Sequence, residues 1–437
     1  MADVTPIKTP AEQALAAAYD GARGKLPGQG AIAALREDAF RRFDAKGLPH
    51  RRVEEWKYTD LRTLLRDALP LAMPPDKQAK RTAQGSGAVF AALNPRKLVF
   101  VDGAFVPEMS DLTPEQGLSI GSLAEALAKG DALVTAHLGK TFATEDAAVA
   151  LNAALMGDGA VIRVAAGTAL ARPIQLVHFT ATESSNYTRS LIVVEKGAHA
   201  AIAETHDGCA AQVNAALELV VGDDAQVDYF KIVAARGIHV GSLMMSAGRN
   251  ARFDTFVLNQ EVGVVRNQSF IRFAGEHSTG AVRGVNLLRG EEHVDNTLLI
   301  EHAAAHCAGR EQFKAVLDGE SHSVFQGKIV VKPGAQKTDS KMMTRALLLS
   351  DKAEADNKPE LEIFADDVVC GHGATAGALD PTLKFYLMSR GIDEAQAETL
   401  LIQAFIGETV EEIPHEGFRD AVMDAALGWM ATREVKP

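Results

Sequence analysis

The middle of the chain carries turns of one recurring kind at nearly even intervals, and this pattern restricts the fold more than any other feature. From about residue 159, short runs of Val, Ile and Leu alternate with turns rich in Gly, Asp, Asn and Lys. The turns begin near residues 196, 222, 248, 275, 302, 319, 334 and 351, so their spacings are about 26, 26, 27, 27, 17, 15 and 17 residues. Little helical periodicity lies between them, which disfavours βαβ units.

Evenly spaced turns of similar composition are typical of stacked β-coils, because each coil buries its apolar face only against its neighbours. We therefore predict one continuous, elongated β-solenoid from about residue 160 to 370, with strands stacked in parallel. A β-sandwich is the alternative fold, since its strands are also separated by regular turns.

Helical patterns precede this region. Residues 31–43 carry apolar side chains at helical spacing and are followed by the breakers Gly47 and Pro49. A second helical pattern in residues 51–65 would let Trp56, Leu61, Leu64 and Leu65 share one face, and residues 69–87 are expected to form a loop. A small hairpin should turn at Asp102–Gly103, and the Ala-rich stretch from about Leu123 to Leu155 should be helical.

Helical patterns also end the chain. Asp380 before Pro381 is a typical helix start, Gly391 a typical helix end, and Asp393 the expected cap of a further helix. The apolar face of a last helix is formed by Phe418, Val422, Ala425, Ala426 and Trp429. We predict an N-terminal helical region with a small hairpin (1–158), a β-helix core (159–372) and a C-terminal helical region (373–437), which could cap the solenoid or offer a docking surface.

Charge and cysteine content exclude several classes of function. The 437-residue chain has a formal net charge of −12, whereas binding to nucleic acid requires a basic face. No apolar run approaches the roughly 18 residues of a membrane helix, and the first residues lack a signal-peptide pattern. Only Cys209, Cys307 and Cys370 are present, which argues against a disulfide framework and for a reducing, cytoplasmic location.

The glycine-rich stretch DDVVCGHGATAG places a thiol, Cys370, two residues before an imidazole, His372. Thiolate and imidazole are apt ligands for iron, zinc or copper(I), but a closed metal site usually needs about four ligands. The remaining ligands would come from elsewhere in the chain or from a second protein. A nucleophile with its base would need an orienting group and an oxyanion site, and a buried cysteine in a glycine-rich turn is the plainer alternative.

Other candidate residues are weaker. His302, His306 and Cys307 lie close together in EHAAAHC, but a polar turn with a structural histidine explains them more simply. The pairs Asp223–Asp224 and Asp366–Asp367 would point to opposite faces of a strand and so form a poor active site. The GKT at residues 139–141 lacks the upstream glycine of a phosphate loop, and we find no dinucleotide fingerprint, so an active site for ATP or NAD is not supported.

Several long stretches resemble a known family. They are RRVEEWKYTDL, GESHSVFQGKIVV, AQKTDSKMMTRALLLS, PELEIFADDVVCGHGATAGALD and FYLMSRGI. Together they are similar to the SufB/SufD family of iron–sulfur cluster assembly proteins, and the early EEWKYTDLR and the Cys-Gly-His arrangement are more similar to SufD than to SufB. The resemblance covers the whole chain and is densest between about Gly319 and Gly391.

The resemblance implies a right-handed parallel β-helix between helical regions, pairing with a SufB-like protein through the β-helix, and docking of the ATPase SufC on the C-terminal helices. ATP would then act only through SufC. It also implies that His372, with Cys370 beside it, lies at the SufB interface next to a transient iron–sulfur cluster. Reduced flavin in the complex would be a further cofactor, for which the sequence gives no support, and the isolated chain could form a homodimer.

Two classes of function therefore remain. The first is a non-enzymatic scaffold subunit of a SufB–SufC–SufD complex, which supplies ligands and docks an ATPase without contacting nucleic acid or membrane. The second is a stand-alone β-solenoid enzyme with a carboxylate or Cys/His active site. Cys370 and His372 supply only about half of the ligands of a metal site, and a partner protein would supply the others. This shortage of ligands within the chain favours the scaffold.

Overall fold

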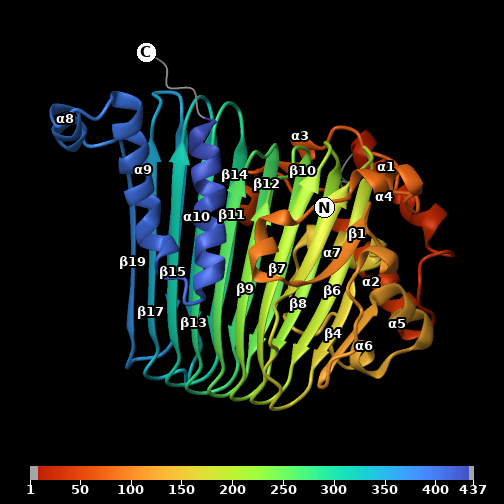
Figure 1. The fold of residues 1–437 in the computed structure, drawn as a ribbon. Helices are drawn as coiled ribbons and strands as arrows, with labels where there is room; N and C mark the ends of the chain where they lie inside the picture. Colours follow the sequence, from red (N-terminus) through yellow and green to blue (C-terminus); the bar gives the residue numbers. More distant parts are fainter. Residues whose placement is uncertain (1–7, 433–437) are drawn as a thin grey trace, which may run out of the picture.

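The computed structural model describes residues 8–432, whose centre is an elongated β-helix made of two sheets (Figure 1). From β4 onward, sheet B contains the odd-numbered strands and sheet A the even-numbered ones. In spatial order, sheet B comprises β19 (Val369–Gly377), β17 (Asp339–Leu348), β15 (Ala308–Leu317), β13 (Thr279–Leu288), β11 (Arg252–Gln260), β9 (Gln226–Val233), β7 (His199–Gly208), β5 (Ile174–Thr180), β1 (Arg96–Val101) and β2 (Ala104–Phe105). Sheet A comprises β18 (Glu354–Ile363), β16 (His322–Val331), β14 (His293–His302), β12 (Val264–Phe273), β10 (Ile238–Ala247), β8 (Gln212–Val221), β6 (Ser185–Val194), β4 (Ala160–Val164) and β3 (Leu118–Ser122).

From β4 to β19 every strand pairs in parallel with the strand two further along the chain. Consecutive strands therefore alternate between the sheets, and two strands make one coil. Residues one coil apart come into contact, as Asp223 and Arg249 do across 26 residues and Arg310 and Asp339 do across 29. The predicted parallel β-solenoid is confirmed, and the sandwich alternative is wrong.

The uneven spacing of the later turns has a simple structural cause. The turns near residues 196, 222, 248, 275, 302 and 334 all lead from sheet A to sheet B, at one side of the β-helix. Those near 319 and 351 lead from sheet B back to sheet A, at the other side. The shorter intervals in the sequence therefore alternate between two sides of one coil, and the coils themselves do not become shorter.

The turns into sheet B share one backbone conformation. Each has a residue with positive φ whose N–H donates to a carbonyl of the next coil: Gly197, Asp224, Asn250, His277, His306 and Lys337. Asp, Asn and His tolerate the left-handed region better than other side chains, so the sequence supplies suitable residues at most of these turns. Hydrogen bonds between successive turns therefore keep neighbouring coils aligned where the chain passes from sheet A to sheet B.

The interior of the β-helix is filled by alternate residues of each strand. Its main apolar cluster includes Ile192, Val227, Met245, Ile271 and Ile329, all fully or almost fully buried. Because side chains alternate across a strand, the residues between them face outward, where helices or solvent cover them. Residues that are aligned in neighbouring coils consequently point to the same side of the sheet. The direction of a side chain in the last coil can therefore be inferred from its partner one coil earlier.

The N-terminal region lies against one end and the sheet A side of the β-helix. Its helices are α1 (Pro10–Ala22), α2 (Ala31–Lys46), α3 (Leu61–Leu64), α4 (Lys77–Thr82), α5 (Leu123–Lys129), α6 (Ala132–His137) and α7 (Ala147–Leu155), with short 3-10 turns η1 (Glu54–Trp56), η2 (Ala88–Leu93) and η3 (Pro107–Met109). α2 ends at Gly47 as expected, and the hairpin turns at Asp102 and Gly103, both with positive φ.

The prediction of one helix over residues 51–65 is wrong. This segment contains only η1 and α3, and Leu64 is exposed while Trp56 and Leu61 are buried. The cause is tertiary: the Trp56 indole donates to Asp146 over 2.8 Å and stacks on the Arg266 guanidinium, whose carbon lies 3.9 Å from the ring centre. The segment is thereby pinned to the outer face of sheet A. The expected loop at 69–87 also contains α4, and the Ala-rich stretch divides into three helices.

The C-terminal helices are α8 (Pro381–Ser389), α9 (Glu394–Val410) and α10 (Glu416–Ala431). Asp380 and Asp393 cap α8 and α9 as predicted. α9 and α10 run along the outer face of sheet B, where Ile402, Phe418 and Trp429 join an apolar cluster with the sheet (Figure 1). They therefore cover a side of the β-helix and leave its end open. Within residues 8–432 no helix is long and apolar enough to cross a membrane.

Candidate functional site

The last coil of the β-helix has an open edge in both sheets. β18 is the terminal strand of sheet A and β19 the terminal strand of sheet B, so each pairs on one side only. Such edges present free backbone N–H and C=O groups that can pair with another chain. Natural edges are usually protected by Lys, Pro or charge; β18 has Lys358 and Pro359, whereas the sequence of β19, VCGHGATAG, has none of these.

β19 places the two candidate ligands on the inner face of this coil. Cys370 aligns with Ser340 and His372 with Met342 of β17, and both β17 side chains are buried in the interior. Cys370 is half-buried against the interior apolar cluster, whereas His372 is exposed because no further coil covers it. The thiol and the imidazole thus stand side by side at the open end, with their strand edge free.

The hydrogen-bond pattern fixes which backbone groups face the open edge. The Val369 N–H donates to Thr338 over 2.8 Å, toward β17. In a parallel ladder the groups of successive residues point to opposite sides, so the N–H and C=O of Cys370, His372, Ala374 and Ala376 face outward. The edge and the ligand side chains therefore belong to the same residues.

Buried polar groups continue inward from Cys370. Ser340 is fully buried, and its hydroxyl lies 3.2 Å from Nε2 of the buried His302. Glu311 is also buried beside Ser340, and burial raises its pKa to about 8, so the carboxyl is largely protonated at neutral pH. Burial likewise raises the pKa of the Cys370 thiol, with the nearby Asp339 and Glu311 acting in the same direction. Metal binding through this thiol would therefore require an incoming cation to displace its proton.

Cys370 and His372 do not complete a metal site by themselves. Within residues 8–432, neither belongs to a group of three or more His, Cys, Asp or Glu side chains close enough to hold one ion. The shortage of ligands predicted from the sequence thus persists after folding. What the end of the β-helix offers is two potential ligands on a strand with one unpaired edge.

The other residues considered in the sequence have structural positions. His306 occupies a left-handed turn and its ring stacks on His277 at 4.7 Å, while His302 points into the interior and stacks on Phe273. Cys307 is buried, with its sulfur 3.3 Å from the Ser278 hydroxyl. His302, His306 and Cys307 therefore do not converge on one site.

The aspartates of the two Asp-Asp pairs also have structural roles, at the turns between strands. Asp223 accepts from the Arg249 N–H over 2.8 Å, and Asp224 accepts from the Asn250 side chain over 3.0 Å. Asp367 pairs with Lys337, one coil earlier. These carboxylates link successive coils rather than facing one another across an active site.

Comparison with known proteins agrees with this architecture. The family model described as the SufBD core domain of the SUF system for FeS cluster assembly matches residues 177–405, and the SufBD protein N-terminal region matches residues 12–176. The chain belongs to the SufBD family. SufD of Escherichia coli is 30% identical over 393 residues, which cover 86% of this chain and 88% of that protein. An iron–sulfur cluster assembly SufBD family protein of Synechocystis is 30% identical over 386 residues, 84% of each chain. SufD of Bacillus subtilis is 30% identical over 278 residues, 62% of this chain and 64% of that protein.

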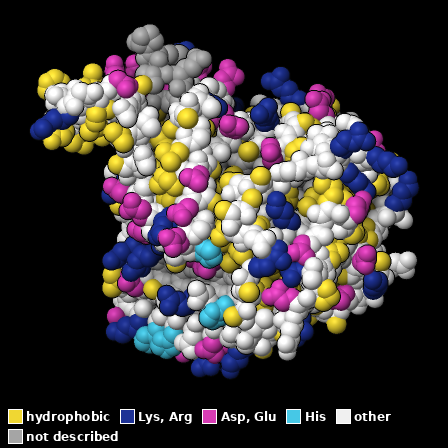
Figure 2. Space-filling model, viewed as in Figure 1, with side chains coloured by type: hydrophobic (Ala, Val, Ile, Leu, Met, Phe, Trp, Pro, Cys, Tyr) yellow, Lys and Arg dark blue, Asp and Glu magenta, His cyan; other side chains and the backbone are white. Residues whose placement is uncertain are grey.

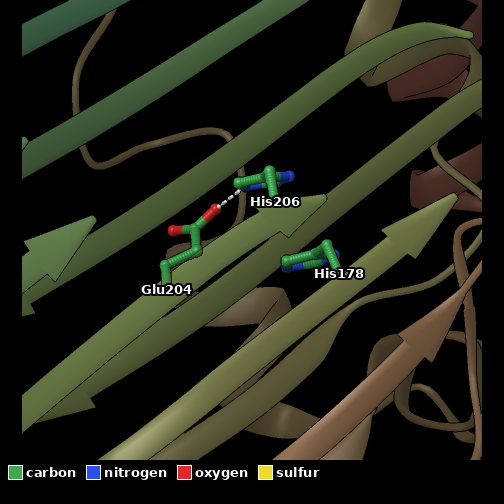
Figure 3. Close-up of side chains that lie close together, drawn as sticks. All are labelled: His178, Glu204 and His206. Atoms are coloured by element: carbon green, nitrogen blue, oxygen red, sulfur yellow. Dashed lines mark hydrogen bonds and ion pairs between the residues drawn. The ribbon is translucent and has the colours of Figure 1, made fainter. Parts of the chain in front are cut away.

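A second polar cluster of this SufBD protein was not anticipated. His178, Glu204 and His206 lie on the neighbouring strands β5 and β7, inside the β-helix and near its N-terminal end (Figure 3). His178 and His206 are aligned across one coil, and their rings stack with centres 4.5 Å apart. The only signal in the sequence is that the two histidines are separated by about one coil length, and the strand register that aligns them follows from the structure alone. Sequence reasoning considered only residues that are close in the chain and so missed it.

Proposed function

We propose that this SufBD protein is a non-enzymatic scaffold subunit of a cytoplasmic iron–sulfur cluster assembly complex. It pairs with a SufB-like protein through the edges of its last coil, and a nascent cluster forms between the two chains. The carrying observation is the terminal strand β19, which combines an unprotected edge with Cys370 and His372. The SufD relatives of Escherichia coli and Bacillus subtilis, which are named as iron–sulfur cluster assembly proteins, support this proposal.

The distribution of exposed apolar side chains supports docking at the same end. Most of the strongly exposed large apolar side chains in the described part of the chain lie there: Ile363, Phe364, Val369, Leu383, Phe385, Tyr386, Met388 and Leu400. Apolar atoms gather on the protruding segment at the upper left of Figure 2, where Figure 1 places α8. Exposed apolar side chains gathered on one helix commonly mark a protein–protein interface, and α8 carries Leu383, Phe385, Tyr386 and Met388.

In this proposal His372 is the stronger ligand of the pair. A neutral imidazole binds a metal near pH 7 as it stands, whereas the Cys370 thiol, whose pKa is raised by burial, must first lose its proton. The cluster is the cargo of the complex: iron and sulfur arrive there and leave with the recipient. ATP acts only through the docked ATPase, since this chain has no phosphate-binding loop.

Ala374→Pro should abolish pairing with a SufB-like partner while leaving the fold intact. The N–H of Ala374 faces the open edge, so proline removes a donor needed for pairing but none of the bonds to β17. Binding should be measured by co-purification of the two chains and by the mass of the complex. Ala374→Ser retains the N–H and is the matched control. Normal pairing by the folded proline variant would refute strand-edge docking.

Phe385→Asp should weaken binding of a SufC-like ATPase by about thirtyfold or more, the loss typical of a hot-spot residue. Phe385 is 72% exposed on α8, a helix whose described residues bury no side chain, so the variant should fold normally. Truncation of the C-terminal helices is a less specific test, because α9 and α10 cover apolar residues of sheet B and their removal would expose those residues.

The ATPase affinity should be measured by calorimetry with each purified variant. Leu112→Asp is the control, because Leu112 is a similarly exposed apolar residue, at 45%, in the N-terminal region. Equal ATPase affinity for the Phe385 variant and the parent chain would exclude α8 as the docking surface.

A further inference from the structure

The interior of the early coils contains a cluster of ionisable side chains where a β-helix normally packs apolar ones. It consists of His178 on β5, Glu204 and His206 on β7, Lys231 on β9 and His239 on β10. Glu204, His206 and His239 are 4%, 4% and 1% exposed. β7 lies six strands from β19 in sheet B, roughly 29 Å at the usual strand spacing. The cluster is therefore separate from the terminal coil.

Three potential ligand groups converge on one point. Figure 3 shows His178 and His206 from adjacent strands with the Glu204 carboxylate beside them. One ligand atom from each lies within 4.8 Å of the others. Glu204 interacts with Nε2 of His206 over 2.5 Å and accepts from the Tyr229 hydroxyl over 2.5 Å. Tyr229 thereby orients the carboxylate from behind, as outer partners of metal ligands commonly do.

A third imidazole lies against the cluster from the opposite sheet. The ring of His239 on sheet A lies 4.5 Å from the ring of His206, edge to face. Neither of its ring nitrogens has a hydrogen-bond partner within residues 8–432. Leaving a buried polar atom unpaired costs about 1–3 kcal/mol, so a bound group that uses a His239 nitrogen would offset a real penalty.

The structure also leaves space at this point. A Cβ at Gly241 would lie 2.5 Å from Lys231 Nζ, 3.0 Å from His239 Nε2 and 3.3 Å from Asn267 Oδ1, so only glycine keeps the spot open. A cavity of about 40 Å³ borders Glu204, Tyr229, Lys231 and Gly241 and touches none of the three histidines, so it lies beside the ligand group on the side of Lys231. One water needs about 10–15 Å³ on this measure, so the cavity has room for water molecules next to Glu204.

We propose that His178, Glu204 and His206 bind a divalent transition-metal ion inside the β-helix, with His239 on sheet A beside them. Imidazole with one carboxylate suits Zn²⁺ or Fe²⁺, whereas Ca²⁺ and Mg²⁺ require mostly oxygen ligands. The three ligands lie on sheet B, and a rotation of the His239 ring would bring a nitrogen from sheet A as the fourth ligand, which would tie sheet A to sheet B across the interior.

Lys231 gives the proposal a distinctive consequence. Its Nζ and His239 both lie beside Gly241, and its positive charge acts to lower the pKa of Glu204 against the effect of burial. A divalent cation must enter against that charge. Removing Lys231 should therefore strengthen metal binding, whereas a cluster built only as an ion pair would simply lose stability.

The test uses the full-length chain with Cys370→Ser and His372→Ala, so that the terminal coil supplies no ligands. Under anaerobic conditions it is titrated with Co²⁺, whose visible bands report four-coordinate binding, and then with Zn²⁺ as competitor. We expect one Co²⁺ per chain. Glu204→Gln or His178→Phe, which continues the ring stack with Phe100, should weaken binding at least about tenfold. Lys231→Met should tighten it.

His302→Asn is the matched control, because His302 is also a fully buried histidine stacked on an aromatic ring but belongs to no ligand group in the described chain. Its Co²⁺ affinity should equal that of the parent. If neither the parent nor the Lys231→Met chain binds Co²⁺ or Zn²⁺ inside the protein, the proposal is wrong. It is equally wrong if the ion binds with unchanged affinity in both the Glu204→Gln and the His178→Phe chains.

Discussion

Replacing Asp295 with alanine should lower the free energy of unfolding by about 3–5 kcal/mol, the cost of breaking a buried ion pair by removing one partner. Asp295 is fully buried and pairs with Arg266, which is 1% exposed. It also accepts from the Thr59 hydroxyl over 2.6 Å, and Arg266 donates to the Glu55 carbonyl over 2.7 Å. The pair therefore holds the EEWKYT segment against sheet A, and the variant should loosen that segment first.

Urea unfolding followed by circular dichroism measures the loss, and proteolysis near residues 51–65 reports the loosened segment. Glu125→Ala is the control, because Glu125 pairs with Lys129 on the exposed face of α5 and such pairs contribute about 0.3–0.5 kcal/mol. The double variant Asp295→Leu with Arg266→Met should be more stable than Asp295→Ala, since no unpaired charge remains buried. A loss below about 1 kcal/mol for Asp295→Ala would contradict this role.

His372→Ala should reduce the cluster formed by the assembled complex at least about tenfold, without affecting folding or pairing. The imidazole stands exposed at the open end, so its removal leaves no buried cavity, and its backbone N–H still serves the strand edge. Cys370→Ser should do less damage, because the thiol contributes only after losing a proton that burial holds in place. Cluster content is measured as iron and acid-labile sulfide after anaerobic reconstitution.

Much of the architecture follows from short-range chemistry. Turn residues that tolerate positive φ, such as Asp224 and Asn250, recur one coil apart and mark the solenoid. Side-chain caps at Asp380 and Asp393, and the Asp102–Gly103 turn, define their elements because the hydrogen bonds and backbone angles involved are local. The Cys370–His372 segment could be recognised for the same reason, since both ligands lie on one strand.

What could not be predicted depends on contacts between distant segments. Residues 51–65 do not form one continuous helix because Trp56 contacts Asp146 and Arg266. Both partners are distant in the sequence, so the spacing of apolar residues within the segment could not reveal them. α9 and α10 cover sheet B because its outer face carries Phe230 and Phe256, a match visible only once the coils are in register. His178 and His206 meet for the same reason, across a full coil.

The central claim is that the last coil supplies one half of a site that a partner completes. It is tested most directly by acid-labile sulfide and iron in anaerobically reconstituted complexes with a SufB-like and a SufC-like protein, using the parent chain and His372→Ala. Sulfide distinguishes a cluster from any metal bound inside the β-helix. The account predicts little sulfide in this chain alone, a full cluster in the parent complex, and at least about tenfold less in the intact His372→Ala complex. A full cluster in the His372→Ala complex, or in the isolated chain, would contradict it.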